Sequence, residues 1–273
     1  MDLKAETPER RQLMSFSPHA SVASANFSSD GRRVVTASWD NSAKIWDATT
    51  GTSLRRLADA HHGYVNSAVF SGDNRSVLNA SDDGVAILWN TDTGQVIRKY
   101  TGHATRIRSA RFSKDGTKIV TASDDKTARV WNVNDDTRAL QKLGGSEGHE
   151  WAVLCAVFSD DGQRVITSSE DNSAKIWDAE TDELYQTLTG HTAAVISVAF
   201  SPDGNRALTA SADFTAKLWD TRTGKEILNL KGHTQAVTSV AFSHDGRQTL
   251  TGSRDRTAIV WLSVDWMRKE SGD

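Results

Sequence analysis

The chain has 273 residues, a net charge of −3 and 25% charged residues, an ordinary globular mixture. The near balance of 32 Lys and Arg against 35 Asp and Glu gives no basic excess for nucleic acid, and no apolar run approaches the roughly 20 residues of a membrane span. A single cysteine, Cys155, excludes an internal disulfide framework and fits a reducing compartment. The chain starts with MDLKAETPER, which lacks the apolar stretch of a signal peptide. We expect a cytoplasmic protein that binds neither nucleic acid nor a membrane.

Beyond residues 1–10, which we expect to be a flexible tail, the sequence repeats itself six times. Phenylalanines stand at 27, 70, 112, 158, 200 and 242, and each is followed 19 residues later by a tryptophan, at 46, 89, 131, 177, 219 and 261. The intervals between units are 43, 42, 46, 42 and 42 residues. A fixed period of this length is the signature of a repeat architecture.

Each unit predicts four short strands, shown here for the fifth. AVISVAF (194–200) and RALTAS (206–211) alternate between apolar and polar residues, and SPDG (201–204) between them predicts a tight hairpin. A second turn near residue 213 leads to AKLW, and TRTG (221–224) leads to KEILNL. No stretch reads as a helix. A four-stranded sheet of about 40 residues cannot bury both faces alone, whereas sheets stacked radially around an axis can.

These units resemble the WD40 repeat of β-propellers. Gly-His stands at 102–103, 148–149, 190–191 and 232–233, a Ser-x-Asp motif follows, and Trp-Asp closes three units at 46–47, 177–178 and 219–220. The resemblance covers residues 11–261 and implies an all-β propeller of six four-stranded blades. The first two units depart from it with Pro18-His19 and Ala60-His61-His62.

The ring is expected to close through the N-terminus. The stretch after Trp261 is polar where a fourth strand should lie, whereas RQLMSF (11–16) has apolar residues at positions that match Ile227, Leu228 and Leu230 of the fifth unit. We therefore expect residues 11–16 to form the outer strand of the last blade and remove a free sheet edge. The predicted propeller spans 11–266, with a tail at 267–273, and we expect a monomeric ring.

Every unit contains His, Ser and Asp, the residue types of a hydrolytic triad. The sets, each with its Trp, are His19/Ser38/Asp40/Trp46, His61/Ser81/Asp83/Trp89, His103/Ser123/Asp125/Trp131, His149/Ser169/Asp171/Trp177, His191/Ser211/Asp213/Trp219 and His233/Ser253/Asp255/Trp261. An enzyme needs one activated nucleophile rather than six. The resemblance implies a structural tetrad instead, in which the Trp indole bonds the Ser, the Ser bonds the His and the His bonds the Asp. No metal, cofactor or catalytic residue is predicted.

The resemblance also implies that partners dock on the top face of the ring. It places there the residue before each tetrad Asp and the two residues that flank the first apolar residue of each inner strand. The resulting candidates are Trp39, Tyr64, Asn66, Asp82, Arg106, Arg108, Asp124, Leu154, Glu170, Ile196, Thr238 and Arg254. Aromatic and arginine side chains are enriched in binding hot spots, although Arg106 and Arg108 could instead pair with Asp82 and Asp124 on a solvated rim. The lengthened loop LGGSEGHE (143–150) is either an insertion or a partner-gripping loop.

We therefore predict a non-catalytic scaffold that binds a protein or peptide on its top face. An apolar group of the partner would lie against Leu154 and Ile196, and an acidic group would reach Arg106, Arg108 or Arg254. The alternative is a sensor or docking module of a larger signalling protein, such as a kinase or NTPase. A propeller hydrolase is disfavoured by the repetition of the triad.

Overall fold

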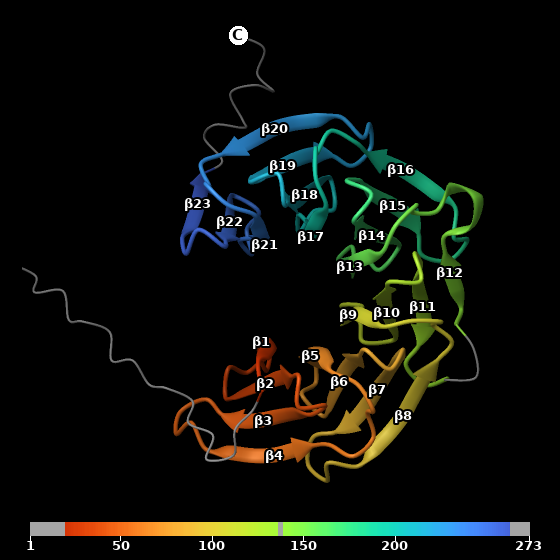
Figure 1. The fold of residues 1–273 in the computed structure, drawn as a ribbon, viewed down its shortest axis with the longest axis vertical. Helices are drawn as coiled ribbons and strands as arrows, with labels where there is room; N and C mark the ends of the chain where they lie inside the picture. Colours follow the sequence, from red (N-terminus) through yellow and green to blue (C-terminus); the bar gives the residue numbers. More distant parts are fainter. Residues whose placement is uncertain (1–19, 136–138, 263–273) are drawn as a thin grey trace, which may run out of the picture.

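The computed structural model describes residues 20–135 and 139–262. This part of the chain is all-β and forms six antiparallel sheets, in which strands that follow one another in sequence are paired. In Figure 1 the sheets follow one another in an arc around a common axis, with β1, β5, β9, β13, β17 and β21 nearest the axis and β4, β8, β12, β16 and β20 outermost. The predicted fold class of successive antiparallel blades is confirmed.

The first three sheets have four strands each. They contain β1 (Val22–Phe27), β2 (Arg33–Ser38), β3 (Ala43–Asp47) and β4 (Ser53–Leu57); β5 (Val65–Phe70), β6 (Ser76–Ser81), β7 (Val85–Asn90) and β8 (Val96–Thr101); and β9 (Ile107–Phe112), β10 (Lys118–Ser123), β11 (Ala128–Asn132) and β12 (Gln141–Leu143).

The fourth and fifth sheets also have four strands, and the sixth has three among the described residues. They contain β13 (Val153–Phe158), β14 (Arg164–Ser169), β15 (Ala174–Asp178) and β16 (Leu184–Leu188); β17 (Val195–Phe200), β18 (Arg206–Ser211), β19 (Thr215–Asp220) and β20 (Glu226–Lys231); and β21 (Val237–Phe242), β22 (Gln248–Ser253) and β23 (Ala258–Leu262).

The predicted hairpins form as the Asp-Gly pairs require. Gly204 has φ of 70°, a left-handed conformation that glycine adopts without steric cost. Ser201 closes the turn, because its Oγ accepts from the N–H of Arg206 at 2.9 Å. In the second unit Asn74 takes the glycine's place at φ of 61°, which asparagine tolerates better than most residues.

One short 3-10 turn, η1 (Gly145–Glu147), interrupts the strands, and the residues that the structure describes form no α-helix. It lies in the lengthened loop, where Gly145 takes a positive φ of 75° and its carbonyl oxygen accepts from the N–H of Gly148. The inserted glycines give the chain room to turn. Residues 20–135 and 139–262 contain no helix long and apolar enough to cross a membrane.

The hydrophobic core is divided among the contacts between consecutive sheets. Five clusters of buried side chains lie at the five contacts. At the last of these contacts, Leu208 and Leu218 of the fifth sheet pack with Val237 of the sixth. Each sheet thus depends on its neighbours for burial, as repeat architectures require.

The closing of the ring lies outside the described residues. The predicted outer strand at 11–16, the expected tails at 1–10 and 267–273, and His19 all fall there, so these remain predictions. Figure 1 shows that the first sheet and the last sheet stand apart at the two ends of the arc.

Candidate functional site

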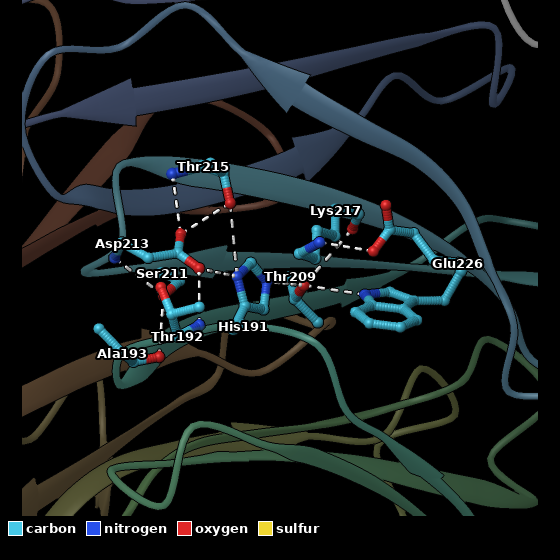
Figure 2. Close-up of polar contacts among 10 residues, drawn as sticks. His191, Thr192, Ala193, Thr209, Ser211, Asp213, Thr215, Lys217 and Glu226 are labelled. Carbon is cyan, nitrogen blue, oxygen red and sulfur yellow. Dashed lines mark hydrogen bonds and ion pairs between the residues drawn. The ribbon is translucent and has the colours of Figure 1, made fainter.

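In the fifth unit a chain of hydrogen bonds joins Asp213, His191, Thr209 and Trp219 (Figure 2). Asp213 Oδ2 and Thr209 Oγ1 each lie 2.7 Å from one imidazole nitrogen of His191. Because a carboxylate can only accept, Nδ1 carries the imidazole proton and Nε2 accepts from the threonine hydroxyl. The indole N–H of Trp219 donates to the same hydroxyl oxygen at 2.9 Å. Both nitrogens of His191 are therefore engaged within the protein.

The sequence interpretation placed Ser211 in this chain, and the structure corrects it. Ser211 Oγ instead accepts from the N–H of Asp213 at 3.0 Å and donates to a backbone carbonyl oxygen at 2.9 Å. Trp219 pairs with Ala207 of β18. Counted from Ala207 along the same face of this strand, Thr209 is two residues away and Ser211 is four. At about 3.3 Å per residue, Ser211 lies about 13 Å from that pair, beyond the reach of the indole.

The same correction applies to the tryptophan of every unit. The predicted indole bonds to the serines are wrong, because each indole N–H donates instead to the side chain two residues before the serine. This acceptor is a threonine in five units and an asparagine in one: Trp46 bonds Thr36, Trp89 bonds Asn79, Trp131 bonds Thr121, Trp177 bonds Thr167, Trp219 bonds Thr209 and Trp261 bonds Thr251. Strand alternation places the acceptor and the serine on one face, and only the acceptor is near the indole.

The serines have a different and equally regular role. Each accepts from the backbone N–H of the aspartate two residues later: Ser38, Ser81, Ser123, Ser169, Ser211 and Ser253. They therefore fix the turn that carries the aspartate and do not join the indole to the histidine. The threonine, or in one unit the asparagine, two residues before each serine was a signal in the sequence that could have revealed the true network.

The aspartate of the first unit, Asp40, was expected to accept from His19. Because His19 lies outside the described residues, the predicted tetrad of this unit is not complete in the structure, and that bond remains a prediction. Asp40 Oδ1 accepts from the N–H of Ser42 at 3.0 Å and from its hydroxyl at 2.6 Å. Asp213 makes the same two bonds with Thr215, at 3.0 and 2.7 Å. Asp40 is therefore held by its turn as Asp213 is.

The histidine–aspartate contact repeats with almost constant geometry. The Nδ1–Oδ2 distance is 2.7 or 2.8 Å in the five units whose histidine is described: His61–Asp83, His103–Asp125, His149–Asp171, His191–Asp213 and His233–Asp255. The indole bond repeats as well, because all six equivalent tryptophans donate to a Thr or Asn side chain. The network is therefore a structural element repeated along the chain. Each such bond contributes about 1 kcal/mol net, and leaving one partner unsatisfied costs more.

Burial sets the protonation of this network. It lowers the pKa of His191 below its ordinary value, against the opposing effect of Asp213, and keeps the imidazole neutral near pH 7. Burial alone would raise the pKa of the Asp213 carboxyl. Hydrogen bonds from Thr215, His191 and the Thr192 N–H outweigh it and lower that pKa to about 2. The pair is therefore a neutral imidazole beside an ionised carboxylate.

A second repeated contact lies at the same edge of every sheet. In each unit the residue before the tetrad Asp donates its backbone N–H to the carbonyl oxygen of the residue before the inner strand: Trp39 to Ser21, Asp82 to Tyr64, Asp124 to Arg106, Glu170 to Ala152, Ala212 to Ala194 and Arg254 to Ala236. The structure thus brings the predicted positions together at one edge of every sheet.

Each inner strand also has a bulge at the second predicted flanking residue. The bulged residues are Ala23, Asn66, Arg108, Leu154, Ile196 and Thr238. A bulge leaves one residue unpaired and redirects its side chain. The bulges therefore set these positions apart from their neighbours along each inner strand.

Aromatic side chains gather over the first two sheets. Trp39 and Tyr64 stack with ring centroids 5.5 Å apart and planes inclined by 15°, and both are exposed. An exposed, pre-stacked pair presents a rigid apolar surface with little rotamer freedom left to lose on binding.

The two candidate arginines share one carboxylate. Arg108 binds Asp124 through two bonds, Nε–Oδ1 at 2.6 Å and Nη2–Oδ2 at 2.9 Å, and this bonding raises the pKa of Arg108. Arg106 Nε lies 3.0 Å from Asp124 Oδ2, and its side chain is half exposed. The rim pairing weighed from the sequence is correct for Asp124 but wrong for Asp82, which accepts from Asn66 at 2.8 Å. Two guanidinium groups thus share the Asp124 carboxylate, and the nearby carboxylates of Glu170 and Asp82 also act on Arg108.

A groove of about 530 Å³ lies beside Arg108, between the third and fourth sheets. It is lined by Arg108, Asp124, Lys126, Glu150, Trp151, Ala152 and Glu170. Glu150 and the exposed Trp151 were not among the residues predicted from the sequence. Trp151 falls outside the repeating tryptophan series, as Trp39 does, and that irregularity was the available signal.

Phe214 is another exposed aromatic residue that the sequence analysis missed. Its φ is 72°, in the left-handed region that a bulky side chain rarely adopts. The matching turn residues in the other units are Asn41, Gly84, Lys126, Asn172 and Arg256, all with positive φ. A strained, exposed aromatic residue at such a turn is a candidate contact residue.

The remaining candidates lie on the other half of the arc. Leu154, Ile196 and Thr238 are half-buried, and Arg254 is exposed. They belong to the turns and inner strands of the fourth to sixth sheets, whereas the aromatic pair belongs to the first two (Figure 1). The structure therefore does not join all predicted residues into one patch. Among the residues that it describes, no group of three or more His, Cys, Asp or Glu could hold a metal ion.

Comparison with known proteins identifies the repeat. A family profile described as "WD domain, G-beta repeat" matches residues 10–47, 51–90, 94–132, 140–178, 182–220 and 224–261. A search of curated proteins finds no match. Each matched segment contains one tetrad Trp together with the Thr or Asn that accepts its indole proton. Because the six segments cover most of the sequence, the chain belongs to the WD40 repeat family.

Proposed function

We propose that this chain is a non-catalytic scaffold that binds a peptide or protein loop on its top face. WD40 repeats serve in general as protein-interaction scaffolds. A rigid frame that carries variable loop residues is suited to this role, because binding residues are concentrated on such loops.

The stacked pair of Trp39 and Tyr64 carries the proposal. The tetrad residues repeat in every unit, whereas this pair occurs once and is exposed. Arg106 lies in the next unit along the same edge, half exposed and with guanidinium donors beyond its single contact with Asp124. We infer that the partner places an apolar or aromatic side chain on the aromatic pair and an acidic group near Arg106.

The bonding of the serines supports the absence of catalysis. A serine nucleophile needs a base within hydrogen-bond reach, but Ser211 bonds backbone groups and His191 bonds Thr209 and Asp213. The neutral histidine is already committed to two partners. Removal of Ser211 would therefore affect stability and leave binding unchanged.

The test is a quantitative pull-down with the full chain from a lysate of its source cells. Partners held by the wild type should be lost by Trp39→Ala with Tyr64→Ala, and by Arg106→Glu. We choose Arg106 because it makes one contact with Asp124, whereas Arg108 holds the same carboxylate through two hydrogen bonds. With a purified partner, each variant should weaken Kd by more than about 5-fold, that is more than 1 kcal/mol.

The matched control is Lys142→Glu, which changes one exposed charge on the outer strand β12. It should retain every partner, and all variants should melt within about 2 °C of the wild type, because rim residues carry little folding energy. If the partners survive the top-face changes and are lost with Lys142→Glu, binding lies on the side of the sheets and the proposal fails.

A further inference from the structure

A second groove, with a volume of about 470 Å³, lies between the second and third sheets. Ser76, Phe112, Gly116 and Val133 are among the residues that line it. Because β6 begins at Ser76 and ends next to Asp82, the groove lies at the opposite edge of the sheet from the top-face candidates. Its volume is within the range of about 300–1,000 Å³ that is usual for ligand sites.

The fourth unit shows which side chain occupies the equivalent place elsewhere in the protein. Arg164 is the repeat equivalent of Ser76. Its guanidinium carbon lies 5.6 Å from the ring centroid of Phe200, and its Nη2 donates to the carbonyl oxygen of Gly204 at 2.9 Å. The hydroxyl of Thr221 donates to the same oxygen at 2.8 Å. An aromatic face and a carbonyl oxygen of the next sheet thus form a guanidinium site.

The first unit repeats this arrangement. The guanidinium carbon of Arg33 lies 5.3 Å from the ring centroid of Phe70, and its Nη2 donates to the carbonyl oxygen of Asn74 at 2.7 Å. The hydroxyl of Thr91 donates to that oxygen as well, at 3.1 Å. The groove that remains beside Arg33 has a volume of about 290 Å³, smaller than the groove at the equivalent place in the second unit.

The serine of the second unit leaves this place open. Gly116, the repeat equivalent of Gly204, lines the larger groove. A Cβ atom added at Gly116 would meet no atom within 4 Å, whereas one added at Gly204 would meet Nη2 of Arg164 at 2.8 Å. The larger groove therefore includes the space that an arginine at position 76 would occupy.

The other parts of a guanidinium site are present in this groove. Phe112, the repeating phenylalanine of the third unit, lines it. Among the described residues, the carbonyl oxygen of Gly116 lacks both side-chain donors found at the other two sites. Ser76 is too short to reach it, and Val133 stands at the position of the donating threonine. A ligand that brings a donor to this oxygen would therefore gain a hydrogen bond.

The charges around the groove favour a cation. The carboxylates of Asp73 and Asp115 line it, together with Lys114 and Arg98. Lys114 is engaged outside the groove, because its Nζ lies 2.6 Å from Oδ2 of Asp160. Two carboxylates then remain against one guanidinium, and opposite charges at short range attract.

Arg98 corresponds to a different position from the open one. Its equivalent in the first unit, Arg55, donates to the carbonyl oxygen of Asp92, while Arg33 donates to that of Asn74. Both arginines line the smaller groove. The fold thus accommodates two guanidinium groups here, and a guest arginine beside Arg98 would reproduce that pair.

We propose that this groove binds an arginine side chain presented by a partner polypeptide. The guanidinium stacks on Phe112 and donates to the carbonyl oxygen of Gly116, and Ile97, which is 46% exposed, offers apolar surface to the aliphatic stem. Arginine is preferred to lysine, because a planar guanidinium can stack on a ring and donate in its own plane at once. The inference is independent of the top-face proposal, since none of the residues predicted there lines this groove.

The probe is N-acetyl-arginine N-methylamide, whose capped ends resemble a peptide, titrated into the full-length chain and followed by NMR. We expect saturable shifts of the Gly116 amide and the Ile97 methyl signals. The lysine analogue should bind at least about fivefold more weakly, and the neutral citrulline analogue at least about tenfold more weakly.

Ser76→Arg should fill the groove from within the chain, as Arg33 and Arg164 do in their units. We expect the affinity for the probe to fall at least about tenfold and the melting temperature to rise by about 2–4 °C. Gln248→Arg is the matched control, because it adds the same side chain at the equivalent position of β22 and should leave the affinity unchanged. If Ser76→Arg does not fold, the three analogues decide the question with the wild-type chain.

Four results would overturn the proposal. The first is no saturable shift at Gly116 and Ile97, or equal binding of the citrulline analogue. The second is unchanged affinity in a folded Ser76→Arg variant. The third is binding that appears only in Arg138→Ser, which would assign the groove to an arginine of this chain outside the described residues. The fourth is tighter binding of free arginine than of the capped probe, which would indicate an amino-acid site.

Discussion

The fifth and sixth sheets are built from the same repeat, yet they differ in burial. In β18 five consecutive residues, 207–211, are buried, whereas in the equivalent strand β22 only Thr249 and Thr251 are. Trp219 is 1% exposed, whereas Trp261 is half-buried although it makes the same bond to a threonine. The fifth sheet has a packed neighbour on both sides and the sixth on one. The repeat pattern thus determines that a sheet forms, whereas the neighbouring sheets determine how deeply its side chains are buried and how much they stabilise the fold.

The largest expected difference is between the two tryptophans. Trp219→Ala should lower the free energy of unfolding by about 3–5 kcal/mol, because it opens a cavity and leaves the Thr209 hydroxyl oxygen without its indole donor. Trp261→Ala should cost less than half as much. Urea unfolding followed by circular dichroism measures both, and equal losses would show that the last sheet is covered in solution.

Leucine truncation tests the apolar part of the same comparison. Leu208→Ala should cost about 2–5 kcal/mol, because its side chain is fully buried. Leu250→Ala should cost under about 1 kcal/mol, since its side chain already contacts water. A cost at Leu250 similar to that at Leu208 would contradict the open end face.

Within the fifth sheet, Thr209 and Ser211 separate the corrected network from the predicted one. Thr209→Val keeps the shape but leaves the Trp219 indole and one His191 nitrogen unsatisfied, so we expect a loss of about 2–3 kcal/mol. Ser211→Ala removes bonds to backbone groups only and should cost about 1 kcal/mol. If thermal unfolding showed a larger loss of stability for Ser211→Ala than for Thr209→Val, the serine would belong to the network after all.

Acidification should weaken the interior units in two stages. The pKa values of His103 and His191 are lowered by burial, so below pH about 6.5 the unfolded chain binds protons that the folded chain does not, and stability falls. The lowered pKa of Asp213, about 2, stabilises the fold above pH about 4 and loses this effect as pH falls from 4 towards 2. Unfolding free energies at pH 8, 6, 5 and 4 should decline steadily, and His191→Asn should decline less steeply. A flat wild-type profile over this range would contradict the neutral, buried imidazole.

The smallest expected effect is a gain in stability. Phe214→Asn places a residue that tolerates positive φ where a strained aromatic now stands, and should stabilise the chain by about 0.5–1 kcal/mol. The matched change Asn172→Phe, at the same turn of the fourth unit, should destabilise it by a similar amount. If Phe214→Asn also weakens partner binding, the strain at this turn has a function.

The fold was predictable because its signals are local and repeated. In every unit a Phe precedes a Trp by 19 residues, as Phe200 precedes Trp219. This spacing, the Ser-x-Asp-Gly hairpins and the alternating strands all depend on residues of one sheet. The threonine of the network was equally local but was missed, because the triad residue types drew attention to Ser211. Trp151 and Phe214 were missed because they break the repeat instead of following it.

The sequence by itself determined the number of units, their strands and their turns, since hairpin geometry and hydrophobic alternation depend on residues close together in the chain. Only the tertiary structure decided which hydroxyl joins His191, that Arg106 and Arg108 share Asp124, and that Trp39 stacks on Tyr64. Those contacts depend on how strands and neighbouring sheets are placed in space. Burial at the ends of the arc was likewise decided by packing, because a repeat cannot record in its own residues whether another sheet lies beside it.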